Sequence, residues 1–202
     1  MNISGHTKPF AVLGHPIGHT LSPVMHNAAI QALKMDAIYL AFNVHPECLM
    51  DVLAAMREMG FGGANLTVPL KEIACRGLSR LDESAQLLGA VNTVKFEPDG
   101  IVGYNTDGGG ALHALGDVKD AHCLVIGAGG ASRAIVDALI HGGAAQVYIL
   151  NRSRLRAEQL IEQAPVGRAA LFTDELLPEM DIVIQTTPVS QSIPFDLDLS
   201  RL

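Results

Sequence analysis

The chain has 202 residues, of which 49 % are hydrophobic and 4 % aromatic, and its formal net charge is −7. This length fits one large or two small domains with buried cores. The negative charge argues against a general nucleic-acid-binding or membrane-surface role, because both require a basic face. No apolar stretch is long enough to cross a bilayer, and the N-terminus is unlike a signal peptide, so we expect a cytoplasmic protein without nucleic-acid or membrane partners.

The cysteines indicate a reducing compartment. Cys48, Cys75 and Cys123 are widely spaced, odd in number and set in apolar or helical contexts. We interpret them as reduced thiols in the core of a cytosolic protein. The histidines are scattered, and no Cys or His pair has metal-ligand spacing, so no metal is expected.

The first part of the chain alternates predicted strands and helices. Apolar runs predict strands over residues 10–13, 37–44 and 63–68. The first helix should begin after Ser22, interpreted as its N-cap, with Pro23 in the first turn. Pro46 and Pro69 open the next two helices. This alternation predicts an α/β domain with a mainly parallel sheet covered by helices.

The pattern changes after residue 81. A predicted helix over 82–88 precedes two apolar runs, 90–96 and 101–104. Pro98-Asp99-Gly100 joins the two runs and predicts a hairpin.

A further helix, expected over 106–115, links this domain to the rest of the chain. We place the boundary close to Asn105, which gives a first domain at residues 1–105 and a second at residues 106–202.

The second domain opens with a glycine-rich turn. The apolar run Cys123–Ile126 ends in Gly127–Ser132 and leads into a segment with helical apolar spacing, 133–140. Strand, glycine turn and helix in that order can hold a pyrophosphate. Glycines let the backbone approach the phosphates, and the N–H groups at the helix start point at the anion.

The next predicted strand, 145–150, ends in a basic cluster. NAD would be expected to meet Asp or Glu here, bonded to the ribose 2′-hydroxyl. The chain offers Arg152, Arg154 and Arg156 instead. Planar guanidinium groups suit a 2′-phosphate, so NADP is favoured over NAD. The plainer alternative is a helix-entry turn followed by a solvated arginine face.

The second domain ends with a helix over 153–163, a short strand near Ala169 and a strand over 181–186. Only four strands are predicted after Ala121, whereas dinucleotide-binding sheets usually have about six. We therefore expect an incomplete Rossmann-like domain.

Three loops of the first domain and its border gather polar side chains at strand ends, where α/β folds bind ligands. The first places hydroxyls at a helix start, which suits a carboxylate. The second offers an amide, a hydroxyl and an ammonium, and the third an amide and a carboxylate. Their residues are Thr20 and Ser22, then Asn65, Thr67 and Lys71, and finally Asn92 and Asp107.

Each of these residues alone has a plainer interpretation. Ser22 and Asp107 suit helix caps, and Lys71 suits a solvated surface charge. The combination of segments carries more weight than any single residue.

Six segments, in this order and approximate spacing, resemble the shikimate dehydrogenase family. They are GHPIGHTLSPVMHN (14–27), NLTVPLK (65–71), GAVNT (89–93), GYNTDG (103–108), GAGGASRA (127–134) and NRSRLRAEQL (151–160). The resemblance covers nearly the whole chain. It implies a substrate-binding, catalytic domain followed by an NADP-binding domain. The implied reaction is the reversible reduction of 3-dehydroshikimate to shikimate, a step in aromatic amino acid biosynthesis.

The resemblance also implies roles for particular residues. Lys71 and Asp107 match the catalytic pair. The matching substrate ligands are Thr20 and Ser22 for the carboxylate, and Asn65, Thr67 and Asn92 for the ring hydroxyls. The matching cofactor-binding residues are Gly127, Ala128, Gly129, Gly130, Ala131, Asn151, Arg152, Ser153, Arg156 and Thr187. Arg154 has no counterpart and is interpreted as a surface charge.

The chain departs from the family pattern in several places. Thr20 stands where Ser is more usual, and its methyl group narrows the pocket against bulkier acids such as quinate. Leu70 replaces a more usual aromatic residue or His, and Ser190 replaces an expected glycine. Family members continue further, with a segment that reaches back to the substrate, so we expect weak or absent turnover.

Two alternatives stay open at this point. One is a quinate/shikimate dehydrogenase that uses NAD, which the arginines at 152 and 156 disfavour. The other is a ligand sensor without catalysis, which an intact Lys71 and Asp107 disfavour. Either a monomer or a homodimer is compatible with the sequence.

Overall fold

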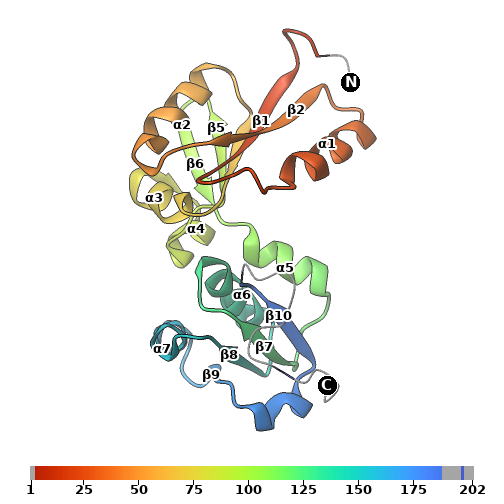
Figure 1. Cartoon of the computed structure of the whole chain (residues 1–202), viewed down its shortest axis with the longest axis vertical. Helices are drawn as coiled ribbons and strands as arrows, with labels where there is room; N and C mark the ends of the chain where they lie inside the picture. Colours follow the sequence, from red (N-terminus) through yellow and green to blue (C-terminus); the bar gives the residue numbers. More distant parts are fainter. Residues whose placement is uncertain (1–2, 188–196, 198–202) are drawn as a thin grey trace. The chain divides into compact units, whose positions relative to one another are not determined.

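The computed structural model describes residues 3–187 and 197. The chain divides into two compact units, Met1–Thr106 and Asp107–Leu202, which we call unit 1 and unit 2 (Figure 1). Each unit contains its own sheet and its own apolar core. The α/β class expected from the sequence is confirmed.

Unit 1 is built on a six-stranded sheet with the order β2-β1-β3-β5-β6-β4. Its strands are β1 (Lys8–Gly14), β2 (Ala37–Asn43), β3 (Gly63–Leu66), β4 (Arg80–Leu81), β5 (Thr93–Glu97) and β6 (Gly100–Tyr104). Parallel pairs join β1 to β2, β1 to β3 and β4 to β6. Because β5 runs antiparallel to β3, the sheet edge at which β1, β2 and β3 end is also the edge at which β5 begins. We call it the carboxyl edge.

Helices cover both faces of this sheet. They are α1 (Ser22–Ala32), α2 (Leu49–Glu58), α3 (Leu70–Gly77) and α4 (Glu83–Leu88). The 3₁₀ helix η1 (Pro46–Cys48) directly precedes α2. Alternate residues of β1 point to opposite faces, as strand geometry requires. Leu13 packs with Leu53 and Leu70 in one core, and Val12 packs with Ile30 of α1 in another. The helix α1 therefore lies on the face opposite α2 and α3 (Figure 1).

Two local expectations are wrong. Ser22 is the first residue of α1 instead of its N-cap; Leu21 takes that position, and the Ser22 hydroxyl pairs with Thr20. Cys48 is exposed at the end of η1, and Cys75 is only partly buried, whereas Cys123 is fully buried. Burial, with the nearby charge of Asp181, raises the pKa of the Cys123 thiol to about 11.

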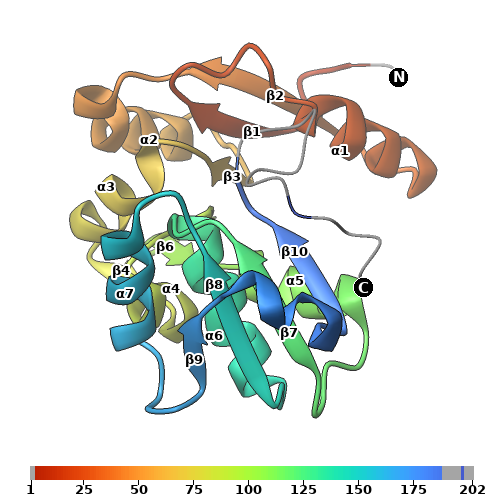
Figure 2. The ribbon, with the colours of Figure 1, turned by 60° about the horizontal axis from the view of Figure 1, so that its bottom comes forward.

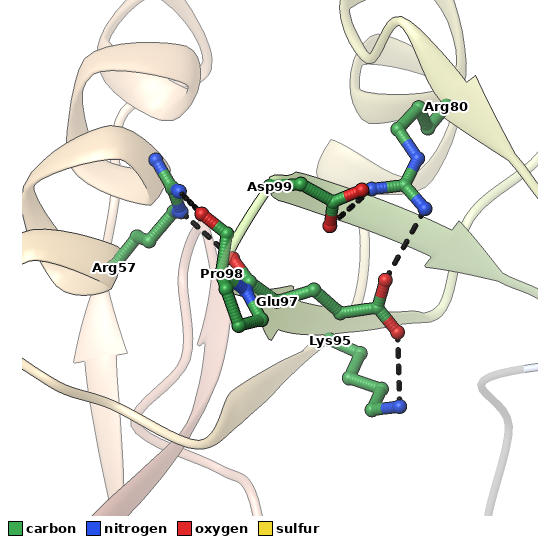
Figure 3. Close-up of polar contacts among 6 residues, drawn as sticks. All are labelled: Arg57, Arg80, Lys95, Glu97, Pro98 and Asp99. Carbon is green, nitrogen blue, oxygen red and sulfur yellow. Dashed lines mark hydrogen bonds and ion pairs between the residues drawn. The ribbon is translucent and has the colours of Figure 1, made fainter.

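Two arginines hold the predicted β5–β6 hairpin. Arg57 on α2 donates from Nε to the carbonyl oxygen of Glu97 at 3.1 Å and also to the carbonyl oxygen of Pro98. Arg80 on β4 pairs with Asp99 at 2.8 Å and with Glu97 at 3.2 Å (Figure 3). Arg57 and Arg80 thus anchor this turn from two different elements, α2 and β4. The turn sets the register of β5 and, with it, the start of β5 at the carboxyl edge.

Unit 2 contains a four-stranded parallel sheet with the order β10-β7-β8-β9 (Figure 2). The strands are β7 (His122–Ile126), β8 (Gln146–Leu150), β9 (Ala169–Leu171) and β10 (Ile182–Gln185). The helices are α5 (Asp107–Leu115), α6 (Gly130–His141), α7 (Arg154–Glu162) and the 3₁₀ helix η2 (Asp174–Glu179). Val125 packs against Leu139 and Leu160 on one face, and Leu124 packs against Leu177 on the other.

Close packing of α5 on α6 fixes the start of unit 2. A side chain at Gly108 would place its Cβ 2.7 Å from the carbonyl oxygen of Ala134, so only glycine fits there. The helix that begins with Asp107 is therefore held against α6 (Figure 1). None of the helices formed by residues 3–187 has both the length and the apolar character needed to cross a bilayer.

Candidate functional site

Backbone pairing brings four of the expected site residues of unit 1 to the carboxyl edge. Asn65 lies near the end of β3, and Thr67 follows the strand. The N–H of Leu66 donates to the carbonyl oxygen of Asn92 at 2.8 Å. The N–H of Val91 donates to the carbonyl oxygen of Lys71 at 3.0 Å, next to Asn92. An amide pair, a hydroxyl and an ammonium-bearing residue thus occupy one edge of one sheet.

A chain of hydrogen bonds connects the side chains at this edge. The Tyr39 hydroxyl donates to Oδ1 of Asn65 at 2.6 Å, and Nδ2 of Asn65 donates to the Thr93 hydroxyl at 3.0 Å. Thr93 in turn donates to Oδ1 of Asn92 at 2.9 Å. The backbone N–H of Thr106 donates to the same oxygen at 3.0 Å. We call this the Tyr39–Asn92 chain; it joins β2, β3 and β5 and ends at Asn92, where Thr106 is a second donor.

The electrostatics of Tyr39 keep the direction of this chain fixed. Tyr39 is 4 % exposed, and burial raises its pKa to about 12. Because its partner is an amide oxygen, which can only accept, the Tyr39 hydroxyl is the donor of this bond. A cavity of about 270 Å³ on unit 1 is lined in part by Tyr39, Asn65, Thr93 and Tyr104.

Thr20 and Ser22 lie together at the start of α1. Their hydroxyl oxygens are 3.2 Å apart, and the Ser22 N–H donates to the Thr20 hydroxyl at 3.2 Å. Both side chains are partly exposed. Two hydroxyls at a helix N-terminus, where the helix dipole is positive, form a suitable place for a carboxylate.

The glycine turn of unit 2 has room for a ligand. Gly127 has φ +121°, and a side chain there would collide with the hydroxyl of Thr186. At Gly129 and Gly130 an added Cβ would meet no protein atom within 4 Å. Protein packing therefore requires glycine at 127, whereas the open space beside 129 and 130 can admit a phosphate close to the backbone.

Hydrogen bonds within the glycine turn show which backbone N–H groups already have a partner and which could bind an anion. The N–H of Gly127 donates to the carbonyl oxygen of Leu150 at 2.8 Å, and that of Gly129 donates to the hydroxyl of Ser132 at 3.0 Å. Gly130 and Ala131 are the first residues of α6, where N–H groups have no partner within the helix. These last two amides are therefore better anion donors than the N–H groups of Gly127 and Gly129.

The basic cluster lies at the start of α7. Arg154 pairs with Glu158 at 2.8 Å, as expected for a surface charge. Arg152 and Arg156 are exposed, and no ion pair to either is found within residues 3–187. Their guanidinium groups, next to the positive end of α7, can bind an anion of two negative charges.

Three other expected cofactor residues have different surroundings. Nδ2 of Asn151 donates to the carbonyl oxygen of Ser153 at 2.9 Å, which shapes the turn before α7. The N–H and hydroxyl of Thr187 donate to Oε1 of Gln185 at 2.9 and 2.8 Å. The residues that follow, 188–190 with the unusual Ser190, lie outside the described residues. In the described part of the chain, no three His, Cys, Asp or Glu side chains gather as a metal site.

Comparison with known families agrees with both halves of this arrangement. A family model described as the shikimate dehydrogenase substrate binding domain matches residues 12–94, and one described as Shikimate / quinate 5-dehydrogenase matches residues 110–196. Over 219 residues the chain is 42 % identical to a shikimate dehydrogenase (NADP(+)) of Geobacter metallireducens, with 100 % of this chain and 77 % of that protein covered. The chain belongs to the shikimate dehydrogenase family.

Other members of the family show the same similarity. A shikimate dehydrogenase (NADP(+)) of Methanococcoides burtonii is 48 % identical over 190 residues, which cover 90 % of this chain and 69 % of that protein. The crystal structure of shikimate 5-dehydrogenase from Thermus thermophilus in complex with NADP(H) and shikimate has a TM-score of 0.78 and 40 % identity. The match covers 89 % of this chain and 68 % of the chain of the Thermus thermophilus enzyme.

Sequence motifs of the shikimate dehydrogenase family did not reveal every residue of the site. Thr93 and Thr106 lie inside segments that carry the resemblance, next to Asn92 and Asp107, but no role was expected for them. Tyr39 was predicted only as part of a strand. Its partner Asn65 lies 26 residues away, and no local pattern signals such a bond.

Proposed function

We propose that the chain is an NADP-dependent oxidoreductase that interconverts shikimate and 3-dehydroshikimate. The observation that carries this proposal is the gathering of Asn65, Thr67, Lys71 and Asn92 at the carboxyl edge of unit 1. In a member of this family, that arrangement supplies hydrogen-bonding groups for a hydroxylated ring beside a group that can transfer a proton. We further propose a cytoplasmic location and a monomer or homodimer.

The substrate is proposed to bind through complementary polar groups. Asn65, Thr67 and Asn92 would contact the ring hydroxyls, and Thr20 with Ser22 would hold the carboxylate at the start of α1. A polyhydroxylated acid needs many fixed partners, because each missing one leaves a buried polar group unpaired.

The residues of unit 2 fit the cofactor NADP. The open space at Gly129 and Gly130, with the amides of Gly130 and Ala131, suits the pyrophosphate. Arg152 and Arg156 suit the ribose 2′-phosphate, with Asn151 and Ser153 shaping the turn before α7. Ala128 and Thr187 complete the proposed contacts. When bound, NADP accepts or supplies the hydride of the reaction.

The proton is assigned to this chain's own side chains. In the reducing direction Lys71 would donate a proton from its ammonium to the substrate carbonyl oxygen as that carbon gains the hydride, and in the oxidising direction its amine would take the hydroxyl proton. We assign to Asp107 the stabilisation of the Lys71 ammonium, as the second member of the pair. Each turnover in the oxidising direction thus releases one proton for each hydride removed.

The decisive experiment mixes the purified protein with shikimate and NADP⁺, then with NAD⁺, and follows absorbance of the reduced nicotinamide. We expect NADP⁺ to be reduced in preference to NAD⁺, at the weak rate anticipated from the sequence. Lys71→Ala should lower kcat by about 10²- to 10⁴-fold while shikimate binding, measured by calorimetry, persists.

Two other results would contradict the proposal. Equal use of NAD⁺ and NADP⁺ would favour the quinate/shikimate alternative. Tight shikimate binding by the unaltered protein without reduction of either cofactor would favour a sensor.

A further inference from the structure

Tyr39 is held rigidly in unit 1 by contacts along its whole length. Its ring stacks on His26 of α1, with centroids 4.1 Å apart and an interplanar angle of 15°. The side-chain amide of Asn27 donates to the Tyr39 carbonyl oxygen at 2.8 Å and accepts from the Tyr39 N–H at 2.9 Å. With its backbone and ring fixed in this way, the hydroxyl has a defined position 2.6 Å from Oδ1 of Asn65.

The surroundings of Asn65 distinguish the two ends of its amide. Nδ2 faces two acceptors, the hydroxyl oxygen of Thr93 at 3.0 Å and the carbonyl oxygen of Asn92 at 3.4 Å. The proton of Thr93 is already donated to the side chain of Asn92. If the amide turned over, its oxygen would face the carbonyl oxygen of Asn92, which is repulsive, and would compete with the Asn92 side chain for the single proton of Thr93.

The hydroxyl of Tyr39 satisfies the other end of the same amide. Without this donor, Oδ1 of Asn65 would lose its partner, and the amide plane could tilt toward water or toward the ligand. Such a tilt would move the amide groups of Asn65 away from the position that they hold at the carboxyl edge, where Asn92 also lies.

We propose that Tyr39 is a positioning residue for shikimate, acting through Asn65: its hydroxyl holds the amide in the orientation that binds the substrate. This inference rests on the proposed function, because it takes Asn65 as a substrate ligand. Tyr39 itself is assigned no contact with the reacting atoms. Its contribution should therefore depend entirely on the presence of the Asn65 amide.

The test is Tyr39→Phe, which keeps the ring on His26 and removes only the hydroxyl. We expect the KM for shikimate to rise about tenfold, equivalent to the loss of one hydrogen bond, while the KM for NADP⁺ stays within about twofold. In an Asn65→Ala background, Tyr39→Phe should leave the KM for shikimate nearly unchanged. Tyr148→Phe, at a partly buried tyrosine on β8 of unit 2, is the matched control.

A merely structural role for Tyr39 would give a different result. In that case Tyr39→Phe would raise the KM for shikimate equally in the presence and absence of the Asn65 amide, and the inference would be overturned. Circular dichroism and the midpoint of thermal unfolding check that each variant is folded.

A second readout does not depend on turnover. The side-chain NH₂ signals of Asn65 in a ¹⁵N-labelled sample, assigned by their loss in Asn65→Ala, should shift in Tyr39→Phe and stay in place in Tyr148→Phe. Unchanged signals would overturn the inference even if the unaltered protein proved inactive toward shikimate. If the unaltered protein is active, and Tyr39→Phe changes neither the NH₂ signals of Asn65 nor the KM for shikimate, this inference is wrong while the proposed function still holds.

Discussion

The hydroxyl oxygens of Ser132 and Thr186 lie 2.7 Å apart and join the first turn of α6 to the end of β10. Thr186 donates its proton to the carbonyl oxygen of Ile126 at 2.7 Å, so Ser132 must be the donor between the two hydroxyls. Ser132 then accepts the N–H of Gly129. This sequence of bonds fixes the glycine turn on which the pyrophosphate is proposed to bind.

Removing the Thr186 hydroxyl should weaken NADP binding. Thr186→Val keeps the side-chain shape but removes the acceptor of the Ser132 proton and one of the two donors to the Ile126 carbonyl oxygen, which keeps the backbone N–H of residue 186. We expect the Kd for NADP⁺, measured by calorimetry, to rise about 5- to 30-fold, because the turn is less well ordered before binding.

Matched variants decide whether this effect belongs to the bonded pair. Ser132→Ala combined with Thr186→Val should weaken binding by less than the product of the two single effects. Thr173→Val, at an exposed threonine before η2, is the control and should bind NADP⁺ normally. Independent, multiplying effects of the two hydroxyls would contradict the coupling.

The arginines at the start of α7 should set the choice between NADP and NAD. Arg152→Ala or Arg156→Ala should raise the KM for NADP⁺ about 10- to 100-fold, because a charge-assisted bond to the 2′-phosphate is lost. The KM for NAD⁺ should change little. Arg154→Ala removes an arginine of the same segment that is paired with Glu158, and it should leave both values near those of the unaltered protein. Equal changes for the two cofactors would argue against a 2′-phosphate site here.

The N-cap of α4 should make part of the stability of unit 1 dependent on pH. Oδ1 of Asp82 accepts from the hydroxyl of Ser84 at 2.6 Å and from its N–H at 3.0 Å. These bonds, the hydroxyl bond first, hold the pKa of Asp82 below its ordinary value of 3.8. Because the folded pKa is lowered, this stabilisation is present above that ordinary value and is lost as the pH falls through the lowered one.

Two substitutions separate the cap from the charge at position 82. At neutral pH, Asp82→Ala should lower the midpoint of thermal unfolding by a few degrees, whereas Asp82→Asn should stay close to the unaltered protein, since Asn is as good an N-cap. As the pH falls below about 4, Asp82→Asn should become the more stable of the two capped proteins, because its amide does not titrate. Parallel acid profiles of the unaltered protein and Asp82→Asn would show that the carboxylate contributes nothing there.

Features that depend on neighbours in the chain could be predicted from the sequence. The strand, glycine turn and helix around Gly127 follow from apolar spacing and from the freedom of glycine, and the hairpin at Asp99 follows from its turn residues. The expectation that Ser22 is an N-cap was wrong. The hydroxyl oxygen of Ser22 accepts from the hydroxyl of Thr20 and caps no backbone N–H of the helix, and Leu21 occupies the N-cap position. The expectation that Cys48 is buried was also wrong, because apolar neighbours in the sequence do not decide which side of a 3₁₀ turn faces solvent.

The sequence by itself determined the order of elements, the α/β class, the glycine turn and the set of polar residues placed at strand ends. Only the tertiary structure decided which of those residues bond to one another: Tyr39 with Asn65, and Ser132 with Thr186, are partners separated by 26 and 54 residues. The physical reason is that a hydrogen bond has a range of about 3 Å and a preferred direction, so it depends on strand order and register. Those, in turn, are set by the packing of whole sheets.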